Sequence, residues 1–356
     1  MTSDILFSRR GAAGLITLNR PKALNALNHG MVLAMRAQLE AWASDDAVTR
    51  VIVTGAGERA FCAGGDIRAL YDLGRAGRQS EMLPFWREEY VLNTVIKRYP
   101  KPYVSLIDGI CMGGGVGLSV HGSHRVAGDR FLFAMPEVGI GFFPDVGATW
   151  FLPRLPGEAG TYCAVTGDRL GAADALAAGI ATHRVASARF AELADALCGM
   201  EPVDATLKAF AAPAGDLKVL AQRVAIDRLF AGDRVEDILA ALDAEAASGR
   251  ADAAFAAKTA AMIRSKSPTS LKLALAQVRA GRALSFEACM QCEFRIVSRI
   301  VYGHDFYEGV RAVIVDKDNA PRWKPDTLAG VSEAEIERHF APLTEGDWSM
   351  PPQERT

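Results

Sequence analysis

The sequence lacks a long apolar run and a strong excess of charge of either sign. Its 40 basic and 42 acidic residues give a formal net charge of -2 at pH 7, so the basic surface that nucleic-acid binding requires is not expected. No stretch approaches the roughly 18 consecutive apolar residues of a membrane-spanning helix. We therefore expect neither a nucleic-acid partner nor a membrane partner.

Cysteine is scarce and scattered, with six residues in a chain of 356. Only Cys289 and Cys292 have C-x-x-C spacing, and one such pair in a helical pattern is more often core or surface than a metal or redox site. Arg9 and Arg10 precede an apolar run, as in a twin-arginine signal, but that run, AAGLITL, is too short and fits a strand better. These features predict reduced thiols and a cytoplasmic location.

The first part of the chain alternates between short β-branched runs and helical patterns. Strands are expected at 13–19, 50–55 and 101–110, and helices at 29–44 and 67–99, because Gly, Pro or Asn bound each run and Asn28 can cap the first helix. Alternating strands and helices predict an α/β fold.

The second part is different in composition. From about Thr206 to Phe306 the sequence is rich in alanine, with apolar residues at spacings of three and four, which predicts helices. Pro and Gly interrupt this periodicity at 201–216. We expect residues 1–205 to form the core with the functional site, and residues 206–356 to form a helical region that closes the site.

Two further motifs each partly match a known functional pattern, but a structural role fits both better. Gly55, Gly57 and Ala60 match G-x-G-x-x-A after a strand, but the following residues are poor for the helix that a dinucleotide site requires. GLSVHG nearly matches a serine-nucleophile elbow, yet His121 replaces its second glycine, so Ser119 fits a helix better.

A metal site is not expected. His121 and His124 have a spacing that a metal tolerates, but no third ligand is near them in the sequence. We expect structural roles for both histidines, and neither a metal nor a separate cofactor.

Two glycine-rich segments each follow a strand and precede a helical run. They are ERAFCAGGDIRAL, which contains Gly65, and GICMGGGVGLSV, which contains Gly114. Glycine turns at such positions can leave N-H groups unpaired, and two N-H groups that converge on one carbonyl form an oxyanion hole. The alternative is that both are only close-packed turns.

Two acidic residues lie in apolar loops rich in Pro and Gly: Glu137 in MPEVGIG and Asp145 in FPDVG. A carboxylate among apolar residues is costly unless a partner or a function compensates for it. Each could instead cap a turn. Together with the glycine segments, they indicate an active site.

These motifs, in this order, resemble the crotonase (enoyl-CoA hydratase/isomerase) superfamily, as do NRPKALNAL and FAMPEVGIGFFPDVGATWFLPRL. The resemblance implies a spiral of ββα units followed by C-terminal helices, an acyl-CoA thioester as substrate and a homo-oligomer. It assigns the oxyanion donors to the N-H groups of Gly65 and Gly114. It also implies that six residues lie along the CoA moiety: Lys22, Ala23, Leu24, Ala63, Asp66 and Ile67.

The segments FWREEYVLN, FPDVG and GHDFYEGVRAVIVDKDNAPRWKP are similar to the branch of this family that hydrolyses 3-hydroxyisobutyryl-CoA in valine catabolism. Hydratases of the family carry a second Glu where this chain has Gly117. The hydrolase pattern instead pairs Glu137 with Asp145, and it places Glu89 on the substrate, at its hydroxyl group. Because hydration needs a paired acid and base, a hydrolase is expected.

Several alternatives remain open from the sequence. Glu137 either attacks the thioester or activates water, and Asp145 either positions that water or protonates the leaving thiol. A short substrate such as 3-hydroxypropionyl-CoA also fits. The rival activities are an enoyl-CoA hydratase or isomerase of the same family, and the non-enzymatic rival is a catalytically inactive scaffold.

Overall fold

The computed structural model describes residues 3–344 and 346–349. Two sheets form the centre of the molecule. The larger has the order β1 (Ile5–Arg10), β2 (Ala13–Leu18), β3 (Arg50–Gly55), β5 (Tyr103–Ile107), β7 (His124–Ala127) and β10 (His183–Arg184). The smaller has the order β4 (Ala60–Cys62), β6 (Ile110–Met112), β8 (Leu132–Ala134) and β9 (Leu170–Gly171).

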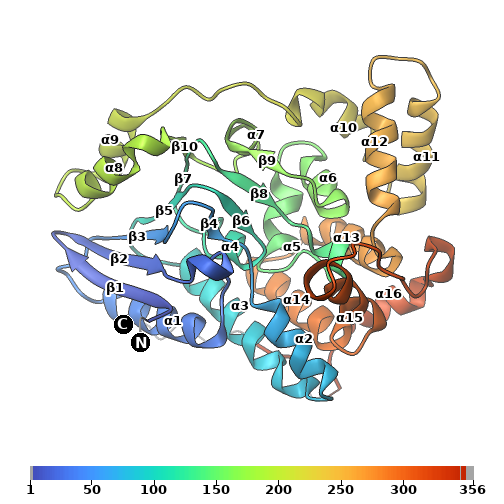
Figure 1. Cartoon of the computed structure of the whole chain (residues 1–356), viewed down its shortest axis with the longest axis horizontal. Coiled ribbons are helices and arrows are strands. Elements are labelled where there is room, and N and C mark those ends of the chain that lie inside the picture. Colours follow the sequence, from blue (N-terminus) through green and yellow to red (C-terminus); the bar gives the residue numbers. More distant parts are fainter. Residues whose placement is uncertain (1–2, 345, 350–356) are drawn as a thin grey trace.

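The chain alternates between the two sheets. β3, β5 and β7 join the larger sheet in parallel, and each is followed by a strand of the smaller sheet, namely β4, β6 and β8. Among the strand pairs of the described residues, only β1–β2 and β8–β9 are antiparallel. Because a stretch of helix follows each pair of strands, this arrangement is the expected spiral of ββα units (Figure 1).

Helices cover both faces of the larger sheet, which explains why β3 and β5 are buried along most of their length. On one face, Leu193, Leu197 and Leu207 pack against Ile52 and Val104 of the sheet. These leucines belong to α8 (Phe190–Leu197) and α9 (Val203–Phe210). α1 (His29–Ala43) and α3 (Leu83–Lys97) contribute to the main core on the other side.

The expected cap of the first helix is confirmed, because the Asn28 side chain accepts a hydrogen bond of 2.9 Å from the Met31 N-H. The single helix expected at 67–99 is wrong. The chain forms α2 (Ile67–Arg75), a short turn and then α3. Gly77 has a φ of +76°, which favours glycine and ends α2, and Pro84 lies at the start of α3, where its missing N-H costs nothing.

Short helices connect the strands of the first half. They are α4 (Gly114–Gly117), α5 (Ala148–Phe151), α6 (Ala159–Thr166) and α7 (Ala172–Ala177), with 3-10 turns at Pro21–Ala23, Gln79–Glu81, Glu137–Ile140, Leu152–Arg154 and Ser187–Arg189. Two of them, α4 and the turn at Glu137–Ile140, begin at residues of the predicted site.

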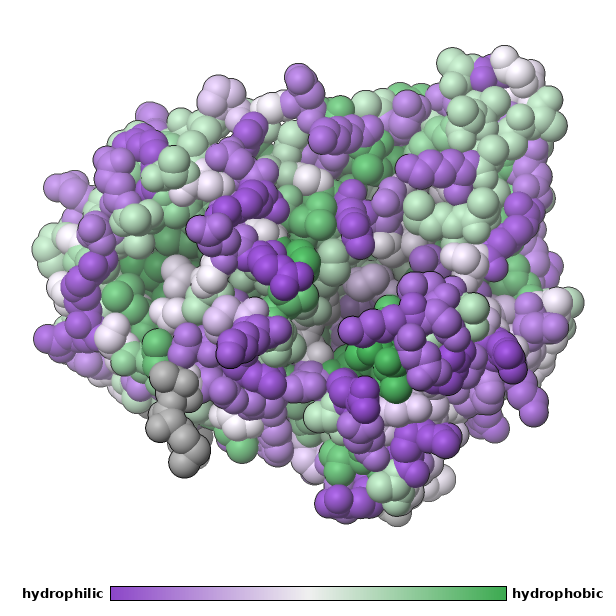
Figure 2. Space-filling view, in the orientation of Figure 1, coloured by the Kyte–Doolittle hydropathy of each residue, from purple (hydrophilic) through white to green (hydrophobic). Residues whose placement is uncertain are grey.

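The second half is helical, as the alanine-rich pattern predicts. Its helices are α10 (Arg223–Leu229), α11 (Val235–Ala246), α12 (Ala253–Arg264), α13 (Pro268–Gly281), α14 (Phe286–Ile300), α15 (His304–Val310) and α16 (Glu333–Phe340). A π-helix (Arg311–Val315) follows α15, and 3-10 turns lie at Leu220–Gln222 and Leu328–Gly330. α11 and α12 project as a hairpin (Figure 1), whose surface in Figure 2 mixes pale green with purple, as expected for alanine interspersed with charged residues.

Residues 211–219, after α9, form no helix or strand. The main hydrophobic core nevertheless includes side chains from both sides of position 205, from Ile5 to Ile336. Because the two parts share this core, the expected division into a core region, 1–205, and a helical region that closes the site, 206–356, stays a prediction. No helix within residues 3–344 and 346–349 combines the length and the apolar character that crossing a bilayer requires.

Candidate active site

The two predicted glycine turns lie side by side at the ends of paired strands. β4 and β6 are parallel, with Cys62 opposite Cys111, so the turns that leave their carboxyl ends meet at one edge of the smaller sheet. A Cβ atom added to Gly113 would lie 3.4 Å from Gly64 Cα, and one added to Gly114 would lie 2.5 Å from Glu89 Oε1. Only glycine allows this close approach.

The N-H groups of Gly65 and Gly114 are free to bind a ligand. Within the described part of the chain, neither donates a hydrogen bond, although the neighbouring Asp66 N-H donates to Leu27 O and the Val116 N-H donates to Gly113 O. Gly114 is the first residue of α4, where an N-H has no partner inside the helix. The two turns thus have the form of an oxyanion hole.

Both turns line a cavity of about 550 Å³ that also contains the predicted acidic residues. Glu89 comes from α3, Glu137 begins a 3-10 turn, and Asp145 lies in the loop that follows it. These three acidic residues are only 2%, 6% and 5% exposed, respectively. The fold therefore brings residues that are far apart in the sequence together in one cavity.

Burial decides the protonation of these carboxyl groups. It raises the pKa of Glu89 and of Glu137 well above the ordinary value, and the nearby Asp145 carboxylate raises both further. Burial also raises the pKa of Asp145, to about 7, although a hydrogen bond of 3.0 Å from the Tyr90 hydroxyl opposes this shift. The cavity therefore contains one carboxyl group, that of Asp145, that can exchange a proton near neutral pH.

Two buried carboxylate oxygens of the cavity wall have no hydrogen-bond partner among the described residues: Glu89 Oε1 and Glu137 Oε2. A buried oxygen without a partner is unusual in a folded protein and costs free energy. Both residues line the cavity, so a ligand there can supply the missing contacts.

Five of the six residues expected along the CoA moiety line the same cavity: Ala23, Leu24, Ala63, Asp66 and Ile67. Lys22 is not brought into it; this residue is exposed on the 3-10 turn at Pro21–Ala23. Asp66 caps α2 by accepting from the Ala69 N-H, and it forms an ion pair of 2.9 Å with Arg20. Its carboxylate therefore has a structural partner as well.

Sequence reasoning missed several residues of the cavity. The cavity wall includes two cationic side chains, Arg68 and Lys266, and the apolar side chains of Trp86, Phe142 and Ile314. Burial lowers the pKa of Lys266. Four of these five residues lie within the quoted motifs, which assign them no role at the site. Lys266 lies outside every motif, more than one hundred residues after Asp145, so only the fold brings it to the cavity.

The weaker motifs have structural roles. β3 ends at Gly55 and the chain continues into β4 without a helix, so no dinucleotide site forms. Ser119 is buried and its hydroxyl donates to Gly115 O at 2.9 Å. Burial raises the pKa of Cys289 and of Cys292 to about 12, which makes both thiols unreactive. Across residues 3–344 and 346–349, no group of three potential ligands could hold a metal ion.

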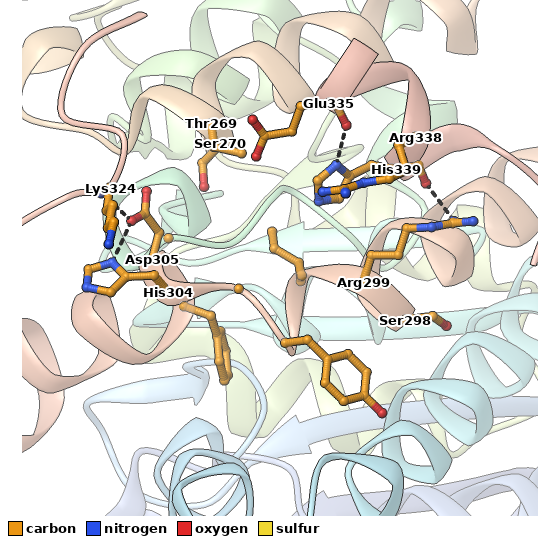
Figure 3. A pocket seen from close by; sticks show the side chains of 15 residues that line it. Thr269, Ser270, Ser298, Arg299, His304, Asp305, Lys324, Glu335, Arg338 and His339 are labelled. Carbon is orange, nitrogen blue, oxygen red and sulfur yellow. Dashed lines mark hydrogen bonds and ion pairs between the residues drawn. The ribbon is translucent and has the colours of Figure 1, made fainter. Parts of the chain in front are cut away.

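A second cavity, of about 370 Å³, contains none of the predicted site residues (Figure 3). His304, Asp305 and Lys324 lie at one end and Arg299 and Arg338 at the other. It shares a wall with the loop between Glu137 and Asp145, because Gly141 packs closely against the Asp305 carbonyl.

A spiral ββα fold in which two free N-H groups face buried carboxyl groups defines a crotonase-type acyl-CoA enzyme. The family model described as "Enoyl-CoA hydratase/isomerase" matches residues 13–340. The chain therefore belongs to the enoyl-CoA hydratase/isomerase family.

Relatives and solved structures agree on the family but differ in name. The chain is 47% identical to the mitochondrial 3-hydroxyisobutyryl-CoA hydrolase of Danio rerio, over 98% of this chain and 92% of that protein. It is similar to a crystal structure named carnitinyl-CoA dehydratase, from Mycobacterium thermoresistibile, with 45% identity, a TM-score of 0.91 and coverage of 97% and 98%. A Rhodobacter sphaeroides structure named enoyl-CoA hydratase has 39% identity, a TM-score of 0.89 and coverage of 97% and 99%.

The expected cytoplasmic location is wrong by this comparison. The vertebrate relatives at 41–47% identity are all named as mitochondrial proteins. The prediction relied on scattered cysteines and on an apolar run too short for a twin-arginine signal. Reduced cysteines suit more than one reducing compartment.

Proposed function

We propose that this chain hydrolyses the thioester bond of 3-hydroxyisobutyryl-CoA and releases 3-hydroxyisobutyrate and free CoA. The observation that carries the proposal is the packing at Gly117. A Cβ atom there would lie 2.7 Å from Asn93 Nδ2 and 2.7 Å from Val146 Cβ. The position therefore has no room for the second carboxylate that water addition to a double bond needs. The names of the vertebrate relatives also support the hydrolase activity.

The geometry gives each group a role in thioester cleavage. The N-H groups of Gly65 and Gly114 bind the thioester oxygen as negative charge develops on it, which is worth about 3 kcal/mol for each donor in comparable enzymes. Glu137 lies beside this turn, since its Oε1 is 3.2 Å from the position of a Cβ atom on Gly113. A carboxylate at this place can reach the carbonyl carbon.

Two routes from this arrangement lead to the same products. In the first, Glu137 attacks the carbonyl carbon, the carbon–sulfur bond breaks, and water then opens the resulting anhydride. In the second, Glu137 takes a proton from water, which attacks directly. In both, Asp145 positions the water or gives a proton to the CoA thiolate, and a group whose pKa is about 7 suits either task.

Glu89 gives the proposed site its preference for a hydroxylated acyl group. Its Oε1 lies next to Gly114 and has no partner among the described residues. A substrate hydroxyl would donate to this oxygen, whereas an acyl group without a hydroxyl would leave it unpaired. Ala23, Leu24, Ala63, Asp66 and Ile67 would lie along the CoA moiety, because they line the same cavity as the oxyanion turns.

Free-thiol release from four thioesters tests the proposal: 3-hydroxyisobutyryl-, 3-hydroxypropionyl-, acetyl- and crotonyl-CoA. Fast release from the two hydroxyacyl substrates alone supports the hydrolase. If crotonyl-CoA loses its double-bond absorbance while no thiol appears, the chain is a hydratase and the packing at Gly117 was misinterpreted. A single turnover in ¹⁸O-water separates the two routes, since only the anhydride route places ¹⁸O in Glu137.

A further inference from the structure

The loop that carries Asp145 is held by buried side chains from four different parts of the chain. Gln277 of α13 donates to Pro144 O, and the Tyr90 hydroxyl of α3 donates to Asp145 Oδ2. His121, which follows α4, contacts Val146 O through Nε2 at 2.7 Å. Glu293 of α14 accepts from the N-H groups of residues 147 and 149, at 2.8 and 2.9 Å.

This loop needs such support because its backbone is in an unfavourable conformation. Val146 has a φ of +53° and Gly147 a φ of +89°. A β-branched residue rarely adopts a positive φ unless the surrounding structure enforces it, and such residues concentrate at functional sites. The direction in which Asp145 points therefore depends on the groups that fix residues 146–149.

Glu293 differs from the other three supports because it is a carboxylate. It is completely buried, and no lysine, arginine or histidine of the described chain pairs with it. A buried carboxylate without a cation is costly. A neutral amide has one acceptor oxygen, so it could not offer a separate oxygen to each N-H group as Glu293 does. Packing alone does not explain why a glutamate occupies this position.

We propose that Glu293 is a positioning residue for Asp145: its carboxylate binds the N-H groups of residues 147 and 149 and so holds Asp145 toward the cavity. This inference rests on the proposed hydrolase function, in which Asp145 handles water or the leaving thiol. Nothing in the sequence motifs marks Glu293, because it lies 148 positions after Asp145 within an apolar helix face.

Glu293 also affects the charge of the site. It faces Asp145 on the loop and Glu89 and Tyr90 on α3, with Cys289 and Cys292 on its own helix. Burial raises the pKa of Glu293 to about 8, the N-H groups of Gly147 and Thr149 oppose this shift, and Asp145 adds to it. Asp145 and Glu293 therefore compete for negative charge and titrate as a pair.

The test is Glu293→Gln, which keeps the volume and replaces one acceptor oxygen by a donor. We expect kcat to fall about 10- to 100-fold, as for other groups that orient a reacting residue, with KM nearly unchanged. Without a competing carboxylate, Asp145 ionises at lower pH, so one limb of the pH profile of kcat moves to lower pH. The acid limb moves if Asp145 acts as an ionised group, and the alkaline limb moves if it acts as an acid.

Glu245→Gln is the matched control, because Glu245 is equally buried but its carboxylate binds Arg228 and Arg250 in the helical region. It should leave the pH profile of kcat in place. If Glu293→Gln does not fold, Glu293→Asp keeps the carboxylate on a shorter side chain. This variant should lower kcat without moving the profile.

A readout without substrate separates this inference from the proposed function. In protein labelled with ¹³C at the Asp carboxyl carbon, the Asp145 signal is assigned by its loss in Asp145→Asn. Its titration midpoint should be lower in Glu293→Gln than in the unmodified protein. Identical midpoints and pH profiles in the two proteins would overturn the inference, whereas absence of thiol release by the unmodified protein would overturn the proposed function alone.

Discussion

Buried carboxylates occur in two regions of this molecule and behave in opposite ways. In the helical region, Glu245 binds Arg228 and Arg250, and these cations lower the pKa of its carboxyl group. In the cavity, Glu89, Glu137 and Asp145 have no cationic partner among the described side chains, and burial raises the pKa of each. One region pairs its buried charge, and the other concentrates it.

Under the proposed function, this difference separates carboxylates with a structural role from those with a role in the reaction. A carboxylate that is paired with cations is stable as an anion, which makes it a weak base and a weak nucleophile. Unpaired groups are held in an unfavourable state that a substrate or a proton can relieve, and enzymes tune their acids and bases in this way. The comparison makes predictions that differ for the two regions.

The largest effect is expected at Glu137. Under the proposed function, Glu137→Gln removes the group that attacks the thioester or activates water, so kcat should fall about 10²- to 10⁴-fold, the range for loss of one acid or base. KM should change little, because the interaction exists mainly in the transition state. Steady-state thiol release measures both constants, and a KM that rises as much as kcat falls would instead assign Glu137 to substrate binding.

A smaller effect, on specificity, is expected at Glu89. Glu89→Gln replaces one acceptor oxygen by a donor, which should lower kcat/KM for 3-hydroxyisobutyryl-CoA about 10- to 100-fold, since leaving a buried hydrogen-bonding group unpaired costs about 1–3 kcal/mol. Isobutyryl-CoA, which lacks the hydroxyl, should be affected much less.

The adjacent Glu88 provides the control for this specificity test. Its carboxylate forms an ion pair with Arg36 outside the cavity. Glu88→Gln should leave both substrates unaffected. Equal losses on both substrates in Glu89→Gln would contradict the role of Glu89 in reading the hydroxyl.

The sequence predicts several residues that the fold brings together in one cavity, because these residues belong to local patterns. Gly65 and Gly114 belong to glycine-rich turns that follow strands, and Glu137 and Asp145 stand out as acids in apolar loops. The order of strands and helices also follows from local periodicity. These features leave a signal in a few neighbouring residues.

The supporting residues leave no such signal. Glu293 and Tyr90 contact the Asp145 loop only because α3 and α14 pack against it. Lys266 enters the cavity wall from the segment between α12 and α13, whereas Lys22, which the motif includes, stays on the surface. The apolar periodicity also predicted one helix where the chain forms α2 and α3. The break occurs because Gly77 and Pro84 interrupt the helix despite that periodicity.

The smallest predicted effect is on stability, and it has opposite signs in the two regions. A carboxyl group whose pKa is raised by folding stabilises the fold at low pH, and this stability is lost as pH rises through the folded pKa. In Glu137→Gln the substituted side chain carries no charge at any pH. The Tm of this variant should therefore exceed that of the unmodified protein by a few degrees at pH 8 and match it at pH 5. Removal of a costly functional group often stabilises an enzyme in this way.

For Glu245 the pKa is lowered by folding, so its contribution is present at neutral pH and lost as pH falls through the folded pKa. Glu245→Gln should therefore have a lower Tm than the unmodified protein at pH 8, with a difference that shrinks only in strong acid. Thermal unfolding of both variants at pH 5 and pH 8 measures the contrast. If both lower the Tm at pH 8, the cavity carboxylates are stabilising, and the distinction between paired and unpaired carboxylates does not explain the site.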